Sequence, residues 1–229
     1  MGGNVMTAGV VSGHPVRFML DDVVLSGELT VPGGAQGIVV FVHGSGSSRF
    51  SPRNQHVAHY FNERGLATLL FDLLGADEQR LDDITREFRF DIALLVRRLV
   101  KVVDRLAEQP ETSRLALGLF GASTGAAAAL VAAAQRPLVV KAVVSRGGRV
   151  DLADSALPQV SAPTLMIVGG KDEEVLALNR SSSRLLSCVQ GLVVVQGASH
   201  LFEEPGMLEQ VAMLSVDWFL KHLVTAHSS

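Results

Sequence analysis

One serine lies in a pattern that is typical of an activated nucleophile. The apolar run 115–120 leads directly into Gly121-Ala122-Ser123-Thr124-Gly125, and a predicted helix of small residues, 126–135, follows at once. Glycine at both ends of this Gly-x-Ser-x-Gly pentapeptide leaves room for a sharp, strained turn between a strand and a helix. Such a turn holds the serine hydroxyl above the end of the sheet. We therefore expect Ser123 to act as a nucleophile.

A base and a carboxylate follow this serine at suitable positions. Serine at its ordinary pKa is a poor nucleophile, so it needs a base that a carboxylate orients. Asp172 follows the predicted strand 164–168, and His200 follows the predicted strand 192–195. Parallel strands present their carboxyl ends at one edge of a sheet, where Ser123 also lies. The sequence thus predicts a catalytic triad of Ser123, His200 and Asp172.

Other acids and histidines remain alternatives. Asp151 and Asp154 follow the preceding predicted strand, 139–145, and compete with Asp172 for the role of the acid. Glu173 and Glu174 are expected to begin the next helix, where the helix dipole favours negative charge. The remaining histidines are weaker candidates for the base, because they lie near the termini or on a partly exposed predicted helix: His14, His56, His59, His222 and His227.

A glycine-rich loop supplies donors for an oxyanion. The run 37–42 is a predicted buried strand, and the loop His43-Gly44-Ser45-Gly46-Ser47-Ser48 follows it. We expect the backbone N–H groups of Ser45 and Thr124 to form the oxyanion hole of a tetrahedral intermediate. His43 is expected to hold the loop by hydrogen bonding. A phosphate-binding loop is the weaker interpretation, because the loop lacks both glycine patterns that cradle phosphates.

Predicted strands and helices alternate along the chain. This alternation implies crossover connections and a mostly parallel central sheet of about eight strands, with helices on both faces. An antiparallel pair, 16–20 and 23–31, is expected to open the sheet. The remaining expected elements are a strand at 66–71 and helices at 53–64, 83–108, 173–188 and 207–224.

The bulk composition describes an ordinary globular domain. The chain has 229 residues, 48% of them hydrophobic, and a formal net charge of −3, which gives no support for nucleic-acid binding. One cysteine, Cys188, excludes an internal disulfide and a thiolate metal cluster. No secretory leader or membrane span is evident, so we expect a cytoplasmic protein. We expect one domain over 1–229, with 1–15 a loose segment, and the basic residues of the helix 83–108 on its solvated face: Arg97, Arg98, Lys101 and Arg105.

Together these motifs resemble the α/β-hydrolase superfamily over about residues 23–223. The order His-Gly-x-Gly, Gly-x-Ser-x-Gly, Asp, His carries the resemblance, and it implies an α/β-hydrolase fold. Three segments, 41–52, 71–74 and 145–149, are similar to those of small dienelactone-hydrolase-like members. True dienelactone hydrolases carry a cysteine nucleophile, whereas this chain has Ser123. The resemblance with this substitution implies a serine esterase.

The substrate pocket is less well defined by the sequence. The segment between the predicted sixth and seventh strands, 146–163, is too short for a helical cap, so we expect an open site without a cap domain. Phe50 is a candidate pocket wall and Arg146 a candidate contact for an anionic substrate. For Arg146 and Arg149 an ion pair with Asp151 or Asp154 is the favoured alternative. Two further acids, Asp77 and Glu78, either line the pocket or face water.

The expected reaction is hydrolysis of a carboxylic ester with a small or accessible acyl group, through an acyl-enzyme and without a metal or cofactor. The expected partner is the small-molecule ester, and a homodimer remains open. Thioester cleavage, peptide cleavage or perhydrolysis at the same site are alternatives. A ligand-binding protein with little turnover on the same scaffold is another, because a fold does not determine function.

Overall fold

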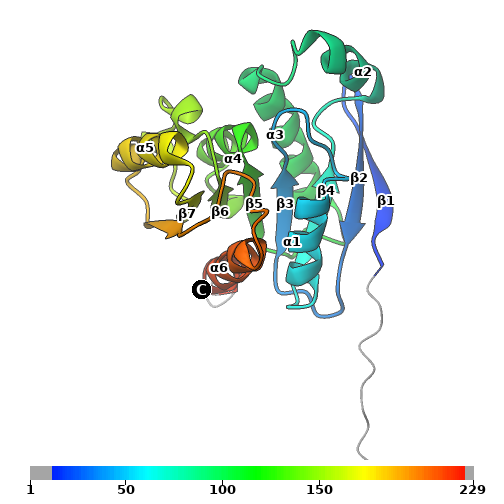
Figure 1. The fold of residues 1–229 in the computed structure, drawn as a ribbon. Coiled ribbons are helices and arrows are strands. Elements are labelled where there is room, and N and C mark those ends of the chain that lie inside the picture. Colours follow the sequence, from blue (N-terminus) through cyan, green and yellow to red (C-terminus); the bar gives the residue numbers. More distant parts are fainter. Residues whose placement is uncertain (1–11, 225–229) are drawn as a thin grey trace, which may run out of the picture.

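The computed structural model describes residues 12–224 and contains one sheet of eight strands in the order β1-β2-β4-β3-β5-β6-β7-β8 (Figure 1). The β1–β2 and β2–β4 pairs are antiparallel, and all the other neighbouring pairs are parallel. This confirms the predicted sheet and its opening antiparallel pair. The strands are β1 His14–Met19, β2 Val24–Thr30, β3 Ile38–Val42, β4 Ala67–Phe71, β5 Leu117–Ala122, β6 Val140–Arg146, β7 Thr164–Gly169 and β8 Gln190–Val195.

Helices cover both faces of the sheet. One face packs against α1 Pro52–Asn62 and α6 Met207–Leu223, and the other packs against α3 Ile92–Glu108 and α4 Thr124–Gln135. Helix α5, Glu173–Ser182, packs on β7 and β8 beside α4. Every residue of β3, β4, β5 and β7 is buried. Strands buried on both faces read as continuous apolar runs, which is why the sequence located them well.

The long helix predicted over 83–108 is two helices. Helix α2, Ala76–Thr85, ends at Arg86, whose φ of 61° is left-handed, and α3 begins after its N-cap, Asp91. Asp82 accepts hydrogen bonds from the backbone N–H groups of Phe88 and Arg89 at 2.8 and 3.0 Å. These bonds replace helical hydrogen bonds in the turn between α2 and α3. The apolar periodicity therefore predicted α3 correctly but wrongly extended the helix to the residues before it.

Arg98 does not lie on a solvated face. It is 1% exposed and donates to the Leu73 carbonyl at 3.0 Å and to the Glu78 carboxylate at 2.7 Å. Burial raises the pKa of Glu78, but the hydrogen bonds from Arg98 and from the Gly75 amide outweigh it and lower the pKa. Glu78 is therefore a structural partner of Arg98.

Smaller differences concern boundaries. The helix predicted over 173–188 ends at Ser182, and a short 3-10 turn, Ser183–Leu185, follows. Of the segment predicted to be loose, 1–15, residues 1–11 lie outside the described residues, and His14 and Pro15 belong to β1. Between β6 and β7 the chain forms only two 3-10 turns, Val150–Ala153 and Leu157–Gln159. Within 12–224 no helix combines the length and the apolar character needed to cross a membrane.

Candidate active site

Ser123 occupies a strained turn between β5 and α4. Its backbone has φ 50° and ψ −123°, which a residue with a side chain rarely adopts and which recurs at functional sites. The helix approaches the sheet closely: a Cβ on Gly125 would lie 2.2 Å from the Val42 carbonyl oxygen, and one on Gly121 would lie 2.5 Å from the Ala126 Cα. Glycine is thus required at both positions, and the serine is presented at the carboxyl edge of the sheet.

Asp172 and His200 contact each other directly. Asp172 Oδ2 lies 2.5 Å from His200 Nδ1, and the Asp172 side chain is 13% exposed. The two loops that carry them are joined by the Lys171 amide, which donates to the Ala198 carbonyl at 2.9 Å. An imidazole bound in this way keeps its Nδ1 proton on the carboxylate side and leaves Nε2 free to accept a proton.

The turn after β6 joins these two loops to the serine. The Ser123 amide donates to the Arg146 carbonyl at 3.2 Å, and the Arg149 amide donates to the Ser123 carbonyl at 3.0 Å. Gly147, between them, packs on the imidazole, because a Cβ there would lie 3.4 Å from His200 Nδ1. The structure therefore brings Ser123, Asp172 and His200 to one place on the sheet edge, although no hydrogen bond joins the serine hydroxyl to the imidazole among the described residues.

The competing acids have other partners. Asp151 binds both Nε and Nη2 of Arg149, at 2.9 and 2.8 Å, and this pair raises the pKa of Arg149. The ion pair anticipated for Arg149 is thus present. Asp154 accepts from the Ser182 hydroxyl at 3.5 Å. Neither acid contacts His200, whereas Asp172 does.

The predicted oxyanion loop, residues 43–48, lies against Ser123. A Cβ on Gly44 would lie 3.0 Å from the Ser123 Cβ. The Ser45 amide points toward the nucleophile turn and donates to the Thr124 hydroxyl oxygen at 2.9 Å. The Ser45 amide therefore already has an acceptor, which an oxyanion would have to displace. Two predicted donors, the amides of Ser45 and Thr124, therefore belong to segments in direct contact.

His43 holds this loop in a neutral form. Its Nδ1 lies 3.0 Å from the Gly44 carbonyl oxygen, and its Nε2 accepts from the Leu73 amide at 3.1 Å. Burial lowers the pKa of His43, which the Gly44 carbonyl only partly offsets. Since Nε2 serves as an acceptor, this histidine ties the loop to the end of β4 and is not available as a catalytic base.

Sequence reasoning missed a clamp on the same loop. The Ser45 hydroxyl donates to the Arg89 carbonyl at 2.9 Å, and the Arg89 guanidinium binds Asp82 through Nε at 2.7 Å. Burial raises the pKa of Asp82, but its bonds with Arg89 and Phe88 outweigh it and lower the pKa. Asp82 lies just before the predicted helix 83–108, and Arg89 lies within it, so the sequence gave no signal of this role: the clamp exists only because the chain turns between α2 and α3.

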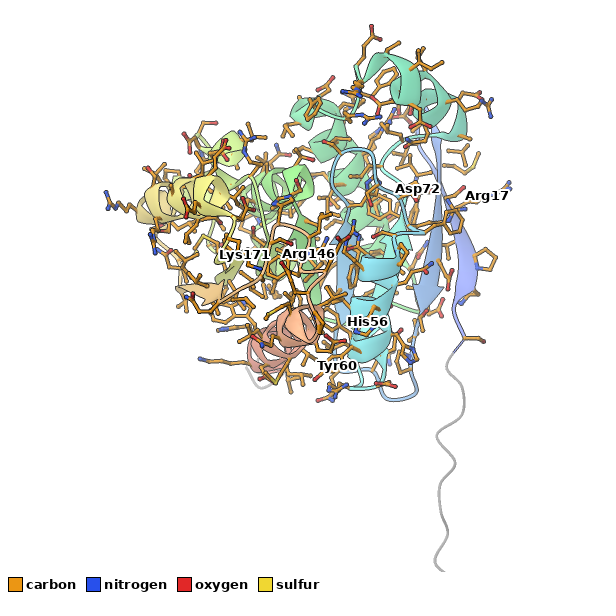
Figure 2. The ribbon with its side chains drawn as sticks, in the orientation of Figure 1. Arg17, His56, Tyr60, Asp72, Arg146 and Lys171 are labelled. Carbon is orange, nitrogen blue, oxygen red and sulfur yellow. The ribbon has the colours of Figure 1, made fainter. Side chains whose placement is uncertain are left out.

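The predicted pocket residues have different surroundings. Phe50 is 60% exposed, with the Arg49 guanidinium 4.2 Å from its ring centroid. It lines a cavity of about 350 Å³ together with Leu74 and Asp72, which is labelled in Figure 2 and forms an ion pair with Arg49. Arg146 is 8% exposed and makes no ion pair with Asp151 or Asp154. Asp77 lies in the first turn of α2 and pairs with Arg80.

The next feature is the arrangement of side chains that could bind a metal ion. Within residues 12–224, no group of three or more His, Cys, Asp or Glu side chains is arranged to hold a metal ion. Cys188 is a free cysteine, and burial raises the pKa of its thiol.

Known proteins share both the sequence and the fold. A family model described as serine aminopeptidase, S33, matches residues 33–155, which include the oxyanion loop and the nucleophile turn. A dienelactone hydrolase from Anabaena variabilis is 54% identical, with a TM-score of 0.92 over 93% of this chain and 99% of that one. Est1E from Butyrivibrio proteoclasticus shares the fold at 18% identity, with a TM-score of 0.76 over 92% and 98% of the two chains.

Curated relatives are longer than this chain. Two Mycobacterium tuberculosis proteins, provisionally named phosphoribosyl transferases, are 55% identical over 208 residues. This match takes in 91% of the present chain but only 46% of each relative, so the chain spans about half of their length. The motifs, the sheet order and the match to the family model agree, and the chain belongs to the α/β-hydrolase family, among its dienelactone-hydrolase-like members.

Proposed function

We propose that this protein is a serine hydrolase that cleaves carboxylic esters through an acyl-enzyme. The observation that carries the proposal is the 2.5 Å contact between Asp172 and His200, at the edge of the sheet where Ser123 is held in a strained turn. Such an arrangement makes a serine nucleophilic at neutral pH, because the imidazole accepts the hydroxyl proton and the carboxylate stabilises the imidazolium.

The proposed reaction has two symmetrical halves. Ser123 Oγ attacks the acyl carbon while His200 Nε2 takes its proton. The carbonyl oxygen becomes an oxyanion between the Ser45 and Thr124 amides and replaces the Thr124 hydroxyl as the acceptor of the Ser45 amide. Collapse breaks the bond to the leaving alcohol, which receives the proton from His200. Water then attacks the acyl-serine while His200 takes its proton. Collapse breaks the bond between the acyl carbon and Ser123 Oγ, which receives that proton from His200, and the acid product leaves. Loss of one oxyanion donor typically costs about 3 kcal/mol of transition-state stabilisation.

Small or accessible acyl groups fit the surroundings of this site best. The segment between β6 and β7 folds as short turns beside α4, so no helical cap covers the edge of the sheet. Phe50 and the cavity of about 350 Å³ offer an apolar wall next to the oxyanion loop. We retain the expectation of a cytoplasmic enzyme that acts on a small-molecule ester.

The first test is covalent labelling with a fluorophosphonate, read by intact-protein mass spectrometry. We expect one adduct on the wild type and none on Ser123→Ala. His200→Ala should lose the adduct and the esterase activity as well. Asp172→Asn should lose most activity, whereas Asp151→Asn, the matched control, should retain it. If the folded wild type took no adduct, the proposal would be wrong and a binding protein on the hydrolase scaffold would replace it.

Similar proteins suggest two competing activities. The family description names an aminopeptidase, so an aminoacyl anilide belongs beside oxygen esters, thioesters and a perhydrolysis assay. The name of the Mycobacterium tuberculosis relatives adds phosphoribosyl transfer, although it refers to chains about twice as long. A larger kcat/KM for the anilide or thioester than for the oxygen esters would contradict ester specificity while leaving the triad in place.

A further inference from the structure

Two arginines beside the nucleophile turn have buried nitrogen atoms without partners. Arg146 is 8% exposed, its Nη1 is fully buried, and none of its nitrogens forms a hydrogen bond within the described residues. The Nε of Arg53 is also buried and unpartnered. Figure 2 shows Arg146 near the centre of the molecule, at the level of the first turn of α1, to which Arg53 belongs.

Arg98 also has one buried nitrogen, Nε, without a partner, but the charge of each other enclosed guanidinium is paired with a carboxylate, unlike that of Arg146. Arg98 binds Glu78, Arg89 binds Asp82 and Arg149 binds Asp151. A buried charge without a counter-ion costs free energy that a folded chain normally avoids. The unpaired state of Arg146 is therefore better explained by a ligand than by a structural role.

The local charge is positive. Burial, and then the nearby positive charge of Arg53, lower the pKa of Arg146 to about 10, so its guanidinium still carries a charge at neutral pH. Among residues 12–224, Glu203 is the one carboxylate that forms an ion pair with either arginine: its Oε1 lies 2.9 Å from Arg53 Nη1, and its side chain is 61% exposed. Two cations and one exposed anion leave one positive charge uncompensated.

The pair lies next to the proposed catalytic groups. Arg146 is the last residue of β6, lies opposite Ala122 in the register, and its carbonyl accepts from the Ser123 amide. Its guanidinium lies 5.9 Å from the ring centroid of Phe120, on the side of the sheet that α1 covers. Arg53 is the second residue of α1, whose dipole adds positive potential there. The two arginines therefore belong to segments that lie beside the turn carrying Ser123.

We propose that Arg146 and Arg53 bind a phosphate group carried by the ester substrate. A carboxylate has two oxygens, and the fork of one guanidinium satisfies both of them. A phosphate monoester has three acceptor oxygens and a charge of about −1.5 to −2 at pH 7, enough to bridge guanidiniums from two different elements. The exposed Glu203 can turn toward solvent when the phosphate displaces it. This inference rests on the proposed esterase function and names its substrate class.

The test separates binding from turnover by using Ser123→Ala protein and inorganic phosphate as the probe. We expect phosphate, and not acetate at the same ionic strength, to raise the melting temperature of this variant. The added substitution Arg146→Met should abolish the shift, and Arg53→Gln should reduce it. Glu203→Gln should strengthen phosphate binding, because it removes the competing carboxylate. Arg64→Gln, which removes one positive charge just beyond the other end of α1, is the matched control and should retain the shift.

A second measurement asks whether Arg146 is structural. In the absence of phosphate we expect Arg146→Met to melt at a higher temperature than the wild type, because the substitution removes an unpaired buried charge.

In the wild type, kcat/KM should be higher for a phenyl acetate that bears a phosphate group than for phenyl acetate itself. Arg146→Met should lower this ratio about tenfold or more, the size of a lost charge-assisted hydrogen bond.

The outcomes that overturn the inference are distinct. Equal stabilisation by acetate would assign the pair to carboxylates, and a phosphate shift that survives Arg146→Met would place the anion elsewhere. A lower melting temperature for Arg146→Met would show a structural role. An esterase that labels at Ser123 but shows no phosphate effect would refute this inference alone, whereas absence of labelling would refute the proposed function.

Discussion

Asp82→Ala is expected to weaken both the fold and the oxyanion loop. Asp82 is 1% exposed and accepts from the Phe88 and Arg89 amides at 2.8 and 3.0 Å and from Arg89 Nε at 2.7 Å. Its removal leaves a guanidinium charge and two amides without their acceptor. Breaking a buried ion pair in this way costs about 3–5 kcal/mol. For a domain of this length 1 kcal/mol corresponds to about 2–4 °C, so the lower bound predicts a loss of about 6–12 °C.

The assay compares Asp82→Ala with its neighbour, Asp83→Ala. The Asp83 side chain is 61% exposed and lies 3.7 Å from Arg89 Nη2, so its loss should change stability by less than about 1 kcal/mol. Both variants lose the same charge, and thermal unfolding followed by circular dichroism measures the difference. Asp82→Ala should also lower kcat, because the Arg89 carbonyl that holds the Ser45 hydroxyl moves with the turn.

The pH dependence of the stability of the same variant is a further test of the ion pair between Asp82 and Arg89. The pKa of Asp82 is lower in the folded state, so its contribution is complete above the unfolded value, near 3.9, and is lost as the pH falls through the folded pKa. The stability difference between wild type and Asp82→Ala should therefore shrink below about pH 4. Equal melting temperatures for Asp82→Ala and Asp83→Ala at pH 7 would refute the clamp.

Three further predictions concern the neighbourhood of the nucleophile. Gly125→Ala should prevent correct folding, because its Cβ would lie 2.2 Å from a backbone oxygen; soluble yield and circular dichroism would show this, and Gly33→Ala, with nothing within 4 Å, should fold normally. Because burial lowers the pKa of His43, its contribution to stability is complete above pH 6.5 and decreases as the pH falls toward the folded pKa. Urea unfolding of the wild type and His43→Asn from pH 7.5 to 5 measures this; a difference in the free energy of unfolding that did not change with pH would contradict it. Phe50→Ala should leave the melting temperature unchanged, since the ring is 60% exposed, but should raise KM for esters with bulky acyl groups; an unchanged KM would remove Phe50 from the pocket.

The sequence predicted those parts of the fold whose cause is local. The central strands were located because burial on both faces requires continuous apolar runs, and the nucleophile turn because its glycines are a steric necessity. The break between α2 and α3 was missed because it depends on the bonds that Asp82 forms with residues six and seven positions later. The burial of Arg98 was missed for a similar reason: its partner, Glu78, belongs to a different helix.

The candidate site shows the same division. Chain order and strand ends predicted that Asp172 and His200 would share an edge with Ser123, because topology alone brings strand ends together. The environment of Arg146 could not be predicted, since whether its guanidinium forms an ion pair depends on packing between β6 and α1. Arg149, three residues later, forms an ion pair with Asp151.

The close approach of α4 to the sheet also determines which positions of this protein tolerate substitution. Residues 124–130, 132 and 133 of the helix are all buried, and most of them are alanine or glycine packed near backbone atoms. A mutational library directed at this helix should therefore yield mainly misfolded protein, even though the helix adjoins the nucleophile. Altered acyl preference should instead emerge from libraries in the loop 47–50 and at the exposed positions of the turns between β6 and β7, where larger side chains do not press on Ser123.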